Sequence, residues 1–421
     1  MIEEELATKP YDWEGGAALQ NHSKRKHKIL REYFQKYLGV RCQIPHQSKF
    51  RLAVIDGFAG GGRYACGSVG SPLIFIEELR AAVERSNLYR VANNLPNLEI
   101  ECLLVLSDQN QAAINLLKAN CAPLVAAAKD ECPALHLLTH FYVGEFERLY
   151  PSIKELVVRG RYRSVLYNLD QCGHSQVRRG TLVDIMRSLA SAEIFLTFAI
   201  ETLLAFLAKT EPERAKAQLR HLDVSPNDLQ GIEKIISDDA WLGAAERLVF
   251  DVFGKCAPFV STFSINNPAG WRYWLIHFAN NYRARQVYNN TLHDNATSQA
   301  HFGRSGLEML SYDPRHDGEK YLFDLGGRAS AKVQLLDDIP RLVSDAGDAI
   351  NVGEFYEAAY SATPAHSDDI HSAIIEAADL EVLTANGGIR RSANTIEPSD
   401  TLRLKRQRSF FPMFLGPSSK A

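Results

Sequence analysis

Carboxylates and glycines stand at the ends of two apolar segments that have the pattern of buried strands. The first segment, residues 51–56, ends at Asp56 and is followed by the glycine loop, residues 57–62, and the second, residues 100–108, ends at Asp108. Glycine lets the backbone approach a ligand closely and adopt positive φ. A strand-end carboxylate can accept hydrogen bonds from both hydroxyls of a ribose. Together these residue types predict a crevice for a nucleotide-like cofactor.

The position of the next helix indicates which cofactor the crevice suits. We expect this helix to begin with Ser71 as its N-cap and Pro72 as its first residue, well after the glycine loop. A diphosphate seated on a helix N-terminus needs the helix directly after the glycines. The spacing therefore favours a cofactor without phosphates, S-adenosylmethionine, with Asp56 and the loop backbone around its amino-acid end and Asp108 on its ribose. A plainer alternative stays open, in which Asp108 caps a helix and the glycines form a turn.

A third group of reactive side chains follows the fourth expected strand, residues 163–170. Asp170, Cys172 and His174 stand there, where a doubly wound sheet faces the substrate beside the cofactor. Asp170 could orient or deprotonate a nucleophile, His174 could act as a base and Cys172 could act as a nucleophile. The alternative is that each only supports the loop. The spacing of His174 from the other histidines does not support a metal site.

These positions require a parallel sheet, and the pattern after residue 50 predicts one. Apolar segments alternate with helical ones, the expected strands being residues 51–58, 100–108, 135–143, 163–170 and 193–199. Short apolar strands separated by helices indicate an α/β fold with a doubly wound sheet covered on both faces. Residues 208–262 have the pattern of a helical insertion. Residues 262–265 and 272–280 then form an expected hairpin around the turn 266–270.

The C-terminal part of the chain has a different pattern. Residues 306–330 are expected to be a linker between a first domain, residues 1–305, and a second, residues 331–410, with a tail at 411–421. Three short helices are expected in the second domain, at residues 335–347, 352–362 and 367–380. Two β-rich arms then flank the turn Asn386-Gly387-Gly388, a strong hairpin signal. Three helices followed by a hairpin predict a winged helix-turn-helix.

Composition limits the functional classes. The 421 residues suggest two domains, and 46% apolar and 23% charged residues fit a globular protein. The net charge of −3 gives no overall basic field, so nucleic-acid binding needs a local patch. No segment has the roughly 20 apolar residues that cross a bilayer, and the N-terminus lacks a secretory pattern. The seven cysteines contain no CxxC pair, so we expect a protein of the reducing cytoplasm.

Two local groups of basic residues are candidates for nucleic-acid contact. Residues 22–39 form an expected amphipathic helix with Gly39 as its stop, and its polar face carries Lys24, Lys28 and Arg31. The wing and tail carry Arg390, Arg391, Arg403, Lys405, Arg406 and Arg408. The third helix of the second domain instead carries Asp368, Asp369, Glu376 and Asp379, which would repel phosphates. A solvated polar face is the alternative for the first group, and protein docking on the acidic helix is as open as DNA contact through the wing.

Together these segments resemble a known family, the three-Cys-motif partner proteins (TcmP). The resemblance lies in the helix HSKRKHKILREYFQKYL, in IDGFAGGGRYACGSVGSP, which follows D-x-F-A-G-x-G-R-Y…G…G-S-P, and in RYWLIHFANNYRARQVYNN and EVLTANGGIRRSANTI. It implies a Rossmann-like class I methyltransferase that uses S-adenosylmethionine and is joined to a winged helix. It also implies a three-Cys-motif protein as partner, in a mobile-element or phage-defence setting. The residues that it implies at the cofactor are Asp56, Phe58, Ala59, Gly60 and Gly62, with Asp170 in the catalytic crevice.

One departure from the family pattern follows Asp170. Gln171 and Cys172 stand where the family has a proline and an aromatic residue, and a missing aromatic removes a stacking partner worth ~1–3 kcal/mol per base. Two functions are therefore expected. The first is methyl transfer to nucleic acid or together with the three-Cys-motif partner. The second is a catalytically degenerate fold that serves as a scaffold or sensor and binds nucleic acid or a protein in a defence complex.

Overall fold

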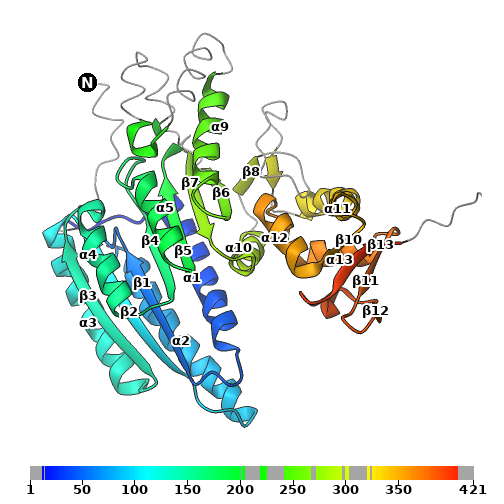
Figure 1. The fold of residues 1–421 in the computed structure, drawn as a ribbon. Coiled ribbons are helices and arrows are strands. Elements are labelled where there is room, and N and C mark those ends of the chain that lie inside the picture. Colours follow the sequence, from blue (N-terminus) through cyan, green and yellow to red (C-terminus); the bar gives the residue numbers. More distant parts are fainter. Residues whose placement is uncertain are drawn as a thin grey trace, which may run out of the picture.

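The fold is mixed α/β, with one large sheet and a smaller C-terminal unit (Figure 1). The computed structural model describes residues 12–13, 15–200, 202–203, 219–224, 241–266, 272–295, 299–302, 320–322 and 325–405. Within these residues the large sheet has the strand order β3-β2-β1-β4-β5-β7-β6-β8-β9. Neighbouring strands pair in parallel from β3 to β5 and antiparallel from β5 to β9. The predicted α/β class and the parallel sheet are confirmed.

Strands β1 to β7 agree with the expected segments to within a few residues, whereas the sequence predicts no strand at β8 or β9. Their bounds are β1 Lys49–Asp56, β2 Glu99–Asp108, β3 Leu135–Val143, β4 Ser164–Leu169, β5 Ser191–Phe198, β6 Phe259–Asn266, β7 Arg272–Ala279, β8 Gln299–Phe302 and β9 Lys320–Leu322. Strand β1 lies between β2 and β4, and Asp56 at its end pairs with Leu106 of β2 and Asn168 of β4. The carboxyl ends of these strands therefore meet at one edge of the sheet. In the sheet, β2 lies on one side of β1 and β4 lies on the other, so the connections lead away from β1 in two opposite directions. This makes the edge a topological switch point.

Helices cover both faces of the sheet, as Figure 1 shows. Their bounds are α1 Asn21–Cys42, α2 Ser71–Ala92, α3 Gln111–Glu131, α4 Phe146–Arg159, α5 Arg179–Ser188, α9 Trp241–Gly254 and α10 Tyr282–Asp294. Leu52 and Val54 of β1 pack in the core formed with α1, α2 and α3. Ala53 and Ile55 pack in the opposite core, formed with α4, α5 and α9. Since successive residues of a strand face opposite sides, this explains why β1 is apolar without alternation.

Three helix and loop predictions need correction. Helix α1 runs on to Cys42, so Gly39 does not end it. The N-cap of α2 is Gly70, and Ser71 is the first residue of the helix. Strand β6 begins at Phe259, inside the segment expected to be a helical insertion (208–262). Residues 208–218 and 225–240 of that segment lie outside the described residues, as does most of the expected turn at 266–270. The β6–β7 hairpin itself is confirmed.

The C-terminal unit contains three helices and a four-stranded sheet of order β10-β13-β11-β12. Its elements are α11 Leu325–Asp345, β10 Ala349–Asn351, α12 Val352–Ala362, α13 Ser367–Glu376, β11 Leu380–Leu383, β12 Ile389–Arg390 and β13 Thr401–Leu404. The predicted hairpin is confirmed, because β11 pairs antiparallel with β12 around Gly387, whose φ is +79°. The expected linker 306–330 is wrong in part: it includes β9 and the start of α11. The expected tail, 411–421, lies outside the described residues.

Polar contacts from α10 hold the C-terminal unit against the large sheet unit. Asn289 donates to the carbonyl oxygens of Thr363 (2.9 Å) and Ala365 (3.2 Å), in the loop between α12 and α13. Arg285, which is fully buried, donates to the Thr363 carbonyl as well.

No helix among the described residues is long and apolar enough to cross a membrane.

Candidate functional site

A cavity of about 530 Å³ opens at the carboxyl edge of the sheet, within the usual range for a small-molecule site. Four loops of the sheet contribute to it, those after β1, β2, β3 and β4. The start of α2, the segment before α1 and α1 itself complete the wall. The residues of the earlier predictions that line it are Phe58, Ala59, Gly60, Asp108, Asp170 and Cys172. Those that do not are Asp56, Gly62 and His174.

Asp108 holds the glycine loop in place. Its Oδ2 accepts a hydrogen bond from the amide of Gly60 (3.0 Å), and its Oδ1 accepts one from the amide of Asn110 (2.9 Å). Burial raises the pKa of this carboxyl group, and the two amides counteract that rise. Asn110 is in turn the N-cap of α3, where its side chain accepts from the amides of Ala112 and Ala113. The N-cap of this helix is thus Asn110, so the alternative in which Asp108 caps a helix is wrong, and Asp108 lines the cavity.

Asp56 lies beneath the cavity rather than in its wall. Its side chain is fully buried, and it accepts hydrogen bonds from the Nδ2 of Asn168 (3.1 Å), the amide of Phe58 (3.3 Å) and the Ser71 side chain. Burial raises its pKa to about 7. The expected contact of Asp56 with a cofactor is therefore wrong. Through these hydrogen bonds the carboxyl group joins β1 to β4 and to the start of α2. It is buried because β2 and β4 flank the end of β1 on both sides.

The glycine loop is covered by the protein's own side chains on the sides where Cβ atoms would stand. A Cβ on Gly60, whose φ is +58°, would lie 2.3 Å from Cζ2 of Trp13, and one on Gly61 would lie 2.6 Å from Cε3 of the same ring. A Cβ on Gly62 would lie 2.7 Å from Leu117. The glycines therefore serve close packing at these positions. Gly62 also accepts the Gly70 amide at 2.7 Å, which gives it a structural role instead of the predicted cofactor contact.

An ion pair occupies the end of β4. Nζ of Lys26, from α1, contacts Oδ1 of Asp170, and the two side chains are 9% and 25% exposed. Burial acts to raise the pKa of Asp170, but the charge and hydrogen bond of Lys26, with help from Thr197, outweigh it and lower that pKa. Asp170 is therefore ionised at the cavity and neutralised from the side of α1.

Cys172 and His174 take different positions in the loop after β4: Cys172 lines the cavity, and His174 does not. The oxygen of the Gln171 side chain accepts the amides of Gln176 (2.9 Å) and Val177 (3.1 Å), which folds the loop back. His174 is buried and packs against Phe198 and His221, with ring centroids 6.0 and 5.4 Å away. The predicted catalytic role of His174 is therefore wrong in its geometry. Cys172 lines the cavity, but burial and then the charge of Asp170 raise the pKa of its thiol, which disfavours the thiolate that a nucleophile needs.

Sequence reasoning missed four side chains at this site: Lys26, His27, Trp13 and Tyr64. Lys26 falls on the same face of α1 as the buried residues Ile29, Leu30 and Tyr33, and this helical spacing could have identified it. His27 lines the cavity, and Tyr64 lies in the loop between β1 and α2. Trp13 precedes α1, in a segment with no periodicity to place it.

His27 is uncharged at neutral pH. Its pKa falls to about 4, chiefly because it is buried; the nearby Asp170 acts to raise the pKa, and Lys26 acts to lower it. Within the described part of the chain, its Nδ1 has no hydrogen-bond partner. His27 therefore adds no charge beside the Lys26–Asp170 ion pair at this end of the cavity.

The lining of the cavity is acidic. It contains four carboxylates and, as its one arginine, Arg178. The carboxylates are Asp108, Glu145, Glu147 and Asp170. Glu147 is fixed by the amide of Arg178 and the hydroxyl of Thr181, both at 2.8 Å. Such a lining favours a cationic ligand.

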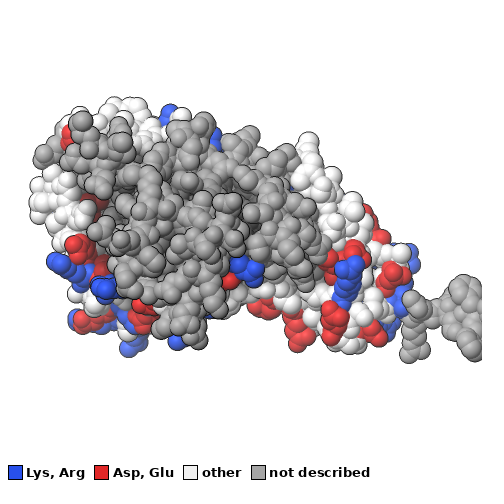
Figure 2. Space-filling model, turned by 90° about the horizontal axis from the view of Figure 1, so that it is seen from above, with Lys and Arg blue, Asp and Glu red and all other residues white. Residues whose placement is uncertain are grey.

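Four of the seven described basic residues that were predicted to contact nucleic acid have acidic neighbours: Lys28, Arg31, Arg390 and Arg403. In α1, Arg31 pairs with Glu77 (2.6 Å) and Glu78 (2.8 Å). Lys28 lies 3.8 Å from Glu32 and is 63% exposed, and Lys24 is exposed. Figure 2 shows basic and acidic side chains beside one another at both ends of the molecule.

In the C-terminal sheet, Arg390 pairs with the buried Asp400 at 3.0 Å. Arg403 pairs with Glu381 at 2.6 Å, and Nζ of Lys405 donates to the Ala378 carbonyl. Arg391 is exposed. Arg406 and Arg408 lie outside the described residues.

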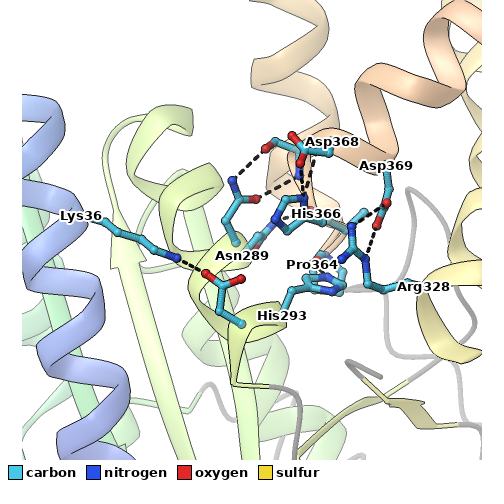
Figure 3. Close-up of polar contacts among 12 residues, drawn as sticks. Lys36, Asn289, His293, Arg328, Pro364, His366, Asp368 and Asp369 are labelled. Atoms are coloured by element: carbon cyan, nitrogen blue, oxygen red, sulfur yellow. Dashed lines mark hydrogen bonds and ion pairs between the residues drawn. The ribbon is translucent and has the colours of Figure 1, made fainter. Parts of the chain in front are cut away.

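The acidic helix α13 makes intramolecular contacts as well (Figure 3). Arg328 of α11 forms a two-pronged ion pair with Asp369, both bonds 2.9 Å long. At the N-terminus of α13, Ser367 donates its amide to Asn290 of α10 at 3.0 Å. A winged helix that reads DNA presents the N-terminal end of its recognition helix to base edges. In this protein that end of α13 is packed on α10.

Comparison with known proteins adds no assignment to this geometry. The chain matches no protein-family model, and no curated protein is significantly similar to it.

Proposed function

We propose that the cavity binds S-adenosylmethionine and that the protein is a Rossmann-like class I methyltransferase. The observation that carries this proposal is the position of Asp108, at the end of β2 in the cavity wall with both oxygens directed by amides of the neighbouring loops. A carboxylate at the end of the second strand of such a sheet is suited to accept ribose hydroxyls. The strand order around β1 supports the same reading, since ligands of open α/β sheets bind at the switch point.

The charge and size of the cavity fit this cofactor. Its volume of about 530 Å³ suffices for a nucleoside with an amino-acid arm, and its lining is acidic. S-adenosylmethionine carries a sulfonium and an ammonium group, so the carboxylates lower the free energy of the bound ligand. At the start of α2 the Ser71 side chain donates to Asp56, so this hydroxyl is engaged within the fold. These features favour a cofactor without phosphates.

Each side chain has a part in such a reaction. The cofactor, when bound, supplies an electrophilic methyl group. Asp108 orients the ribose, and the amide of Gly60 is held by Asp108 beside it. Asp170 stands at the acceptor end as an ionised carboxylate, held by Lys26; it orients the acceptor and stabilises the positive charge that an acceptor nitrogen develops. The raised pKa of Cys172 makes covalent catalysis by this thiol a poor alternative.

We extend the proposal to the family that the sequence resembles. The protein would then be a TcmP-like methyltransferase whose C-terminal unit is a winged helix and whose partner is a three-Cys-motif protein, in a mobile-element or phage-defence setting. The three helices and the β11–β12 hairpin support the winged helix. The contacts of α13 with α10 and α11 favour a unit that serves protein contacts over one that reads DNA with this helix.

A second function remains as a proposal because two observations favour it. Trp13 covers the glycine loop, and Gln171 turns back to bind its own loop in place of the family's proline. A fold that had lost methyl transfer and served as a scaffold or sensor would tolerate both features. It would bind the cofactor or a partner without turnover.

Calorimetry with S-adenosylhomocysteine tests the cofactor proposal. Wild-type protein should bind it, and Asp108→Asn should weaken binding by about tenfold or more, since a hydrogen bond to a charged group contributes ~1.5–3 kcal/mol. Asp130→Asn, an exposed position on α3, is the matched control and should bind like the wild type. Absence of binding by the wild type would refute the cofactor assignment. Binding without methyl transfer to any DNA, RNA or protein offered would favour the scaffold.

A further inference from the structure

We infer that the methyl acceptor is a base of single-stranded nucleic acid, stacked on an aromatic wall formed by Trp13, Tyr64 and His27. The inference rests on the proposed function and names the acceptor of the same site. Its basis is an arrangement of rings that come from three separate segments and meet in the cavity. None of the three belongs to the loop after β4, where the family's aromatic residue stands.

The three rings form a continuous row. The ring centroids of Trp13 and Tyr64 are 5.3 Å apart, and those of Tyr64 and His27 are 5.7 Å apart. All three residues line the cavity. Neighbouring rings are tilted by 47° and 48° to one another, so each ring offers its own face inside an otherwise acidic lining, and His27 is uncharged at neutral pH. Such a face suits a planar ring that stacks.

The segment that carries Trp13 is built into the site. The amide of Ala65 donates to the carbonyl of Ala17 at 2.9 Å, which joins this segment to the loop of Tyr64, and Ala17 is 4% exposed. The Trp13 ring packs closely on Gly60 and Gly61, where any Cβ would displace it. These contacts fix the ring at the cavity.

The wall runs from the glycine loop, where Trp13 packs on Gly60, to the acceptor end of the cavity, where His27 stands. His27 and Asp170 also line one small recess, together with Lys26 and Thr197. Asp108, the proposed ribose contact, lies at the end of β2, two strands from β4 in the sheet. A ring stacked beside His27 is therefore next to the ionised carboxylate that would orient the acceptor. This arrangement supplies the stacking partner that Cys172 does not.

Charges around the cavity favour a polynucleotide that inserts only a base. The carboxylates of the lining repel phosphates. Arg178 lines the cavity, while Arg63 and Lys24 are exposed on the segments that carry Tyr64 and His27. An acidic lining that contains stacking rings matches the recognition of an unstacked base whose phosphate backbone stays in solvent.

Equilibrium binding of short single-stranded oligonucleotides tests the inference. Fluorescence anisotropy of labelled homopolymeric DNA and RNA is measured with the full-length protein and saturating S-adenosylhomocysteine, beside an abasic strand of equal length. We expect Trp13→Leu, which keeps apolar bulk without a π-face, to weaken binding about tenfold, and Trp13→Phe to weaken it less. The affinity for S-adenosylhomocysteine is measured in the same variants, and its loss in Trp13→Leu should be smaller than the loss of oligonucleotide affinity. Tyr89→Ala, at a 63% exposed position remote from the cavity on α2, is the control and should bind like the wild type.

Three results would overturn the inference: no oligonucleotide binding by the wild type, equal binding of the abasic strand, or a Trp13→Leu loss confined to S-adenosylhomocysteine. The last would make Trp13 a cofactor residue. If the wild type binds oligonucleotide but no S-adenosylhomocysteine, and Trp13→Leu weakens the oligonucleotide binding, the base-binding wall is kept and the methyltransferase is refuted. Thermal unfolding of each variant separates these results from a folding defect.

Discussion

The ammonium group of Lys26 in α1 contacts the carboxylate of Asp170 at the end of β4, 144 residues further along the chain. The contact joins the first described helix to the centre of the sheet, at the edge where the cavity opens. Its low exposure sets it apart from the surface ion pairs of this protein, such as Arg148–Glu145. An ion pair in this position supports the fold and fixes the charge at the candidate site.

Removing the cation should destabilise the protein. Lys26→Met leaves Asp170 ionised and little exposed without its partner, and we expect the free energy of unfolding to fall by about 3 kcal/mol. Because the pKa of Asp170 is lowered in the fold, the pair stabilises above the ordinary value of 3.8, and this stability is lost as pH falls through the lowered pKa. Urea unfolding at several pH values measures both effects.

A double variant tests the coupling between the two side chains. Lys26→Met combined with Asp170→Asn removes the unpaired charge, so its loss of stability should be smaller than the sum of the two single losses. Strict additivity would mean that the two groups do not interact in solution.

Asp56 should make stability depend on pH with the opposite sign. Its pKa rises from 3.8 to about 7 on folding, so the folded state binds more protons than the unfolded one between these values, and stability falls as pH rises through this window. Asp56→Asn lacks this component. The stability of the variant relative to the wild type should therefore increase across the window, by up to about 4 kcal/mol.

Urea titrations of both proteins across that window measure the difference. His22 and His27, whose pKa values are lowered to about 4, stabilise with rising pH, but they are common to both proteins and cancel. Parallel stability curves for wild type and variant would show that Asp56 has an ordinary pKa.

The sheet could be predicted from the sequence because its signals are local. The strands β1 to β5 are short apolar segments between helices, and Asp108 and Asp170 follow directly from where β2 and β4 end. Burial of Asp56 could not be predicted in this way. It depends on β2 and β4 flanking β1 together, which is a property of the assembled sheet. His174 was misplaced for a similar reason, since the Gln171 side chain sets the direction of its loop.

Two side chains of the cavity wall that the sequence did not predict, Trp13 and His27, come from the segment before α1 and from α1 itself. Contacts such as Trp13 with Gly60 join residues without any shared periodicity. The glycines were correctly singled out, but the pattern cannot say whether a ligand or a side chain fills the space that their missing Cβ atoms leave. Here Trp13 fills it at Gly60 and Gly61.

Two glycine substitutions separate packing from backbone strain. Gly60 and Gly67 both have positive φ, +58° and +82°, but a Cβ meets Trp13 only at Gly60 and open space at Gly67. Gly67→Ala should cost about 1–2 kcal/mol, the strain of the left-handed conformation. Gly60→Ala should cost clearly more and should displace the indole ring. Urea unfolding and the emission maximum of tryptophan fluorescence measure the two effects.

A second variant identifies the indole as the cause. In a Trp13→Ala background, Gly60→Ala should cost no more than Gly67→Ala does. Equal losses for Gly60→Ala with and without the indole would contradict the packing of Trp13 on the loop.

The docking of α13 on its neighbours leads to the last prediction. Arg328 binds Asp369 through two hydrogen bonds, with the carboxylate 15% exposed, while Lys332 and Glu376 join the same two helices, α11 and α13, at 38% and 50% exposure. A two-pronged, partly buried pair is the stronger of the two. Arg328→Ala should therefore lower the free energy of unfolding by about 2 kcal/mol, and Lys332→Ala by less than about 0.5 kcal/mol. Thermal unfolding of both variants at low and high salt measures the difference, and only the Lys332 pair should be largely screened. Equal effects of the two substitutions would mean that Asp369 is hydrated in solution, and that α13 is free to turn its acidic face away from α11.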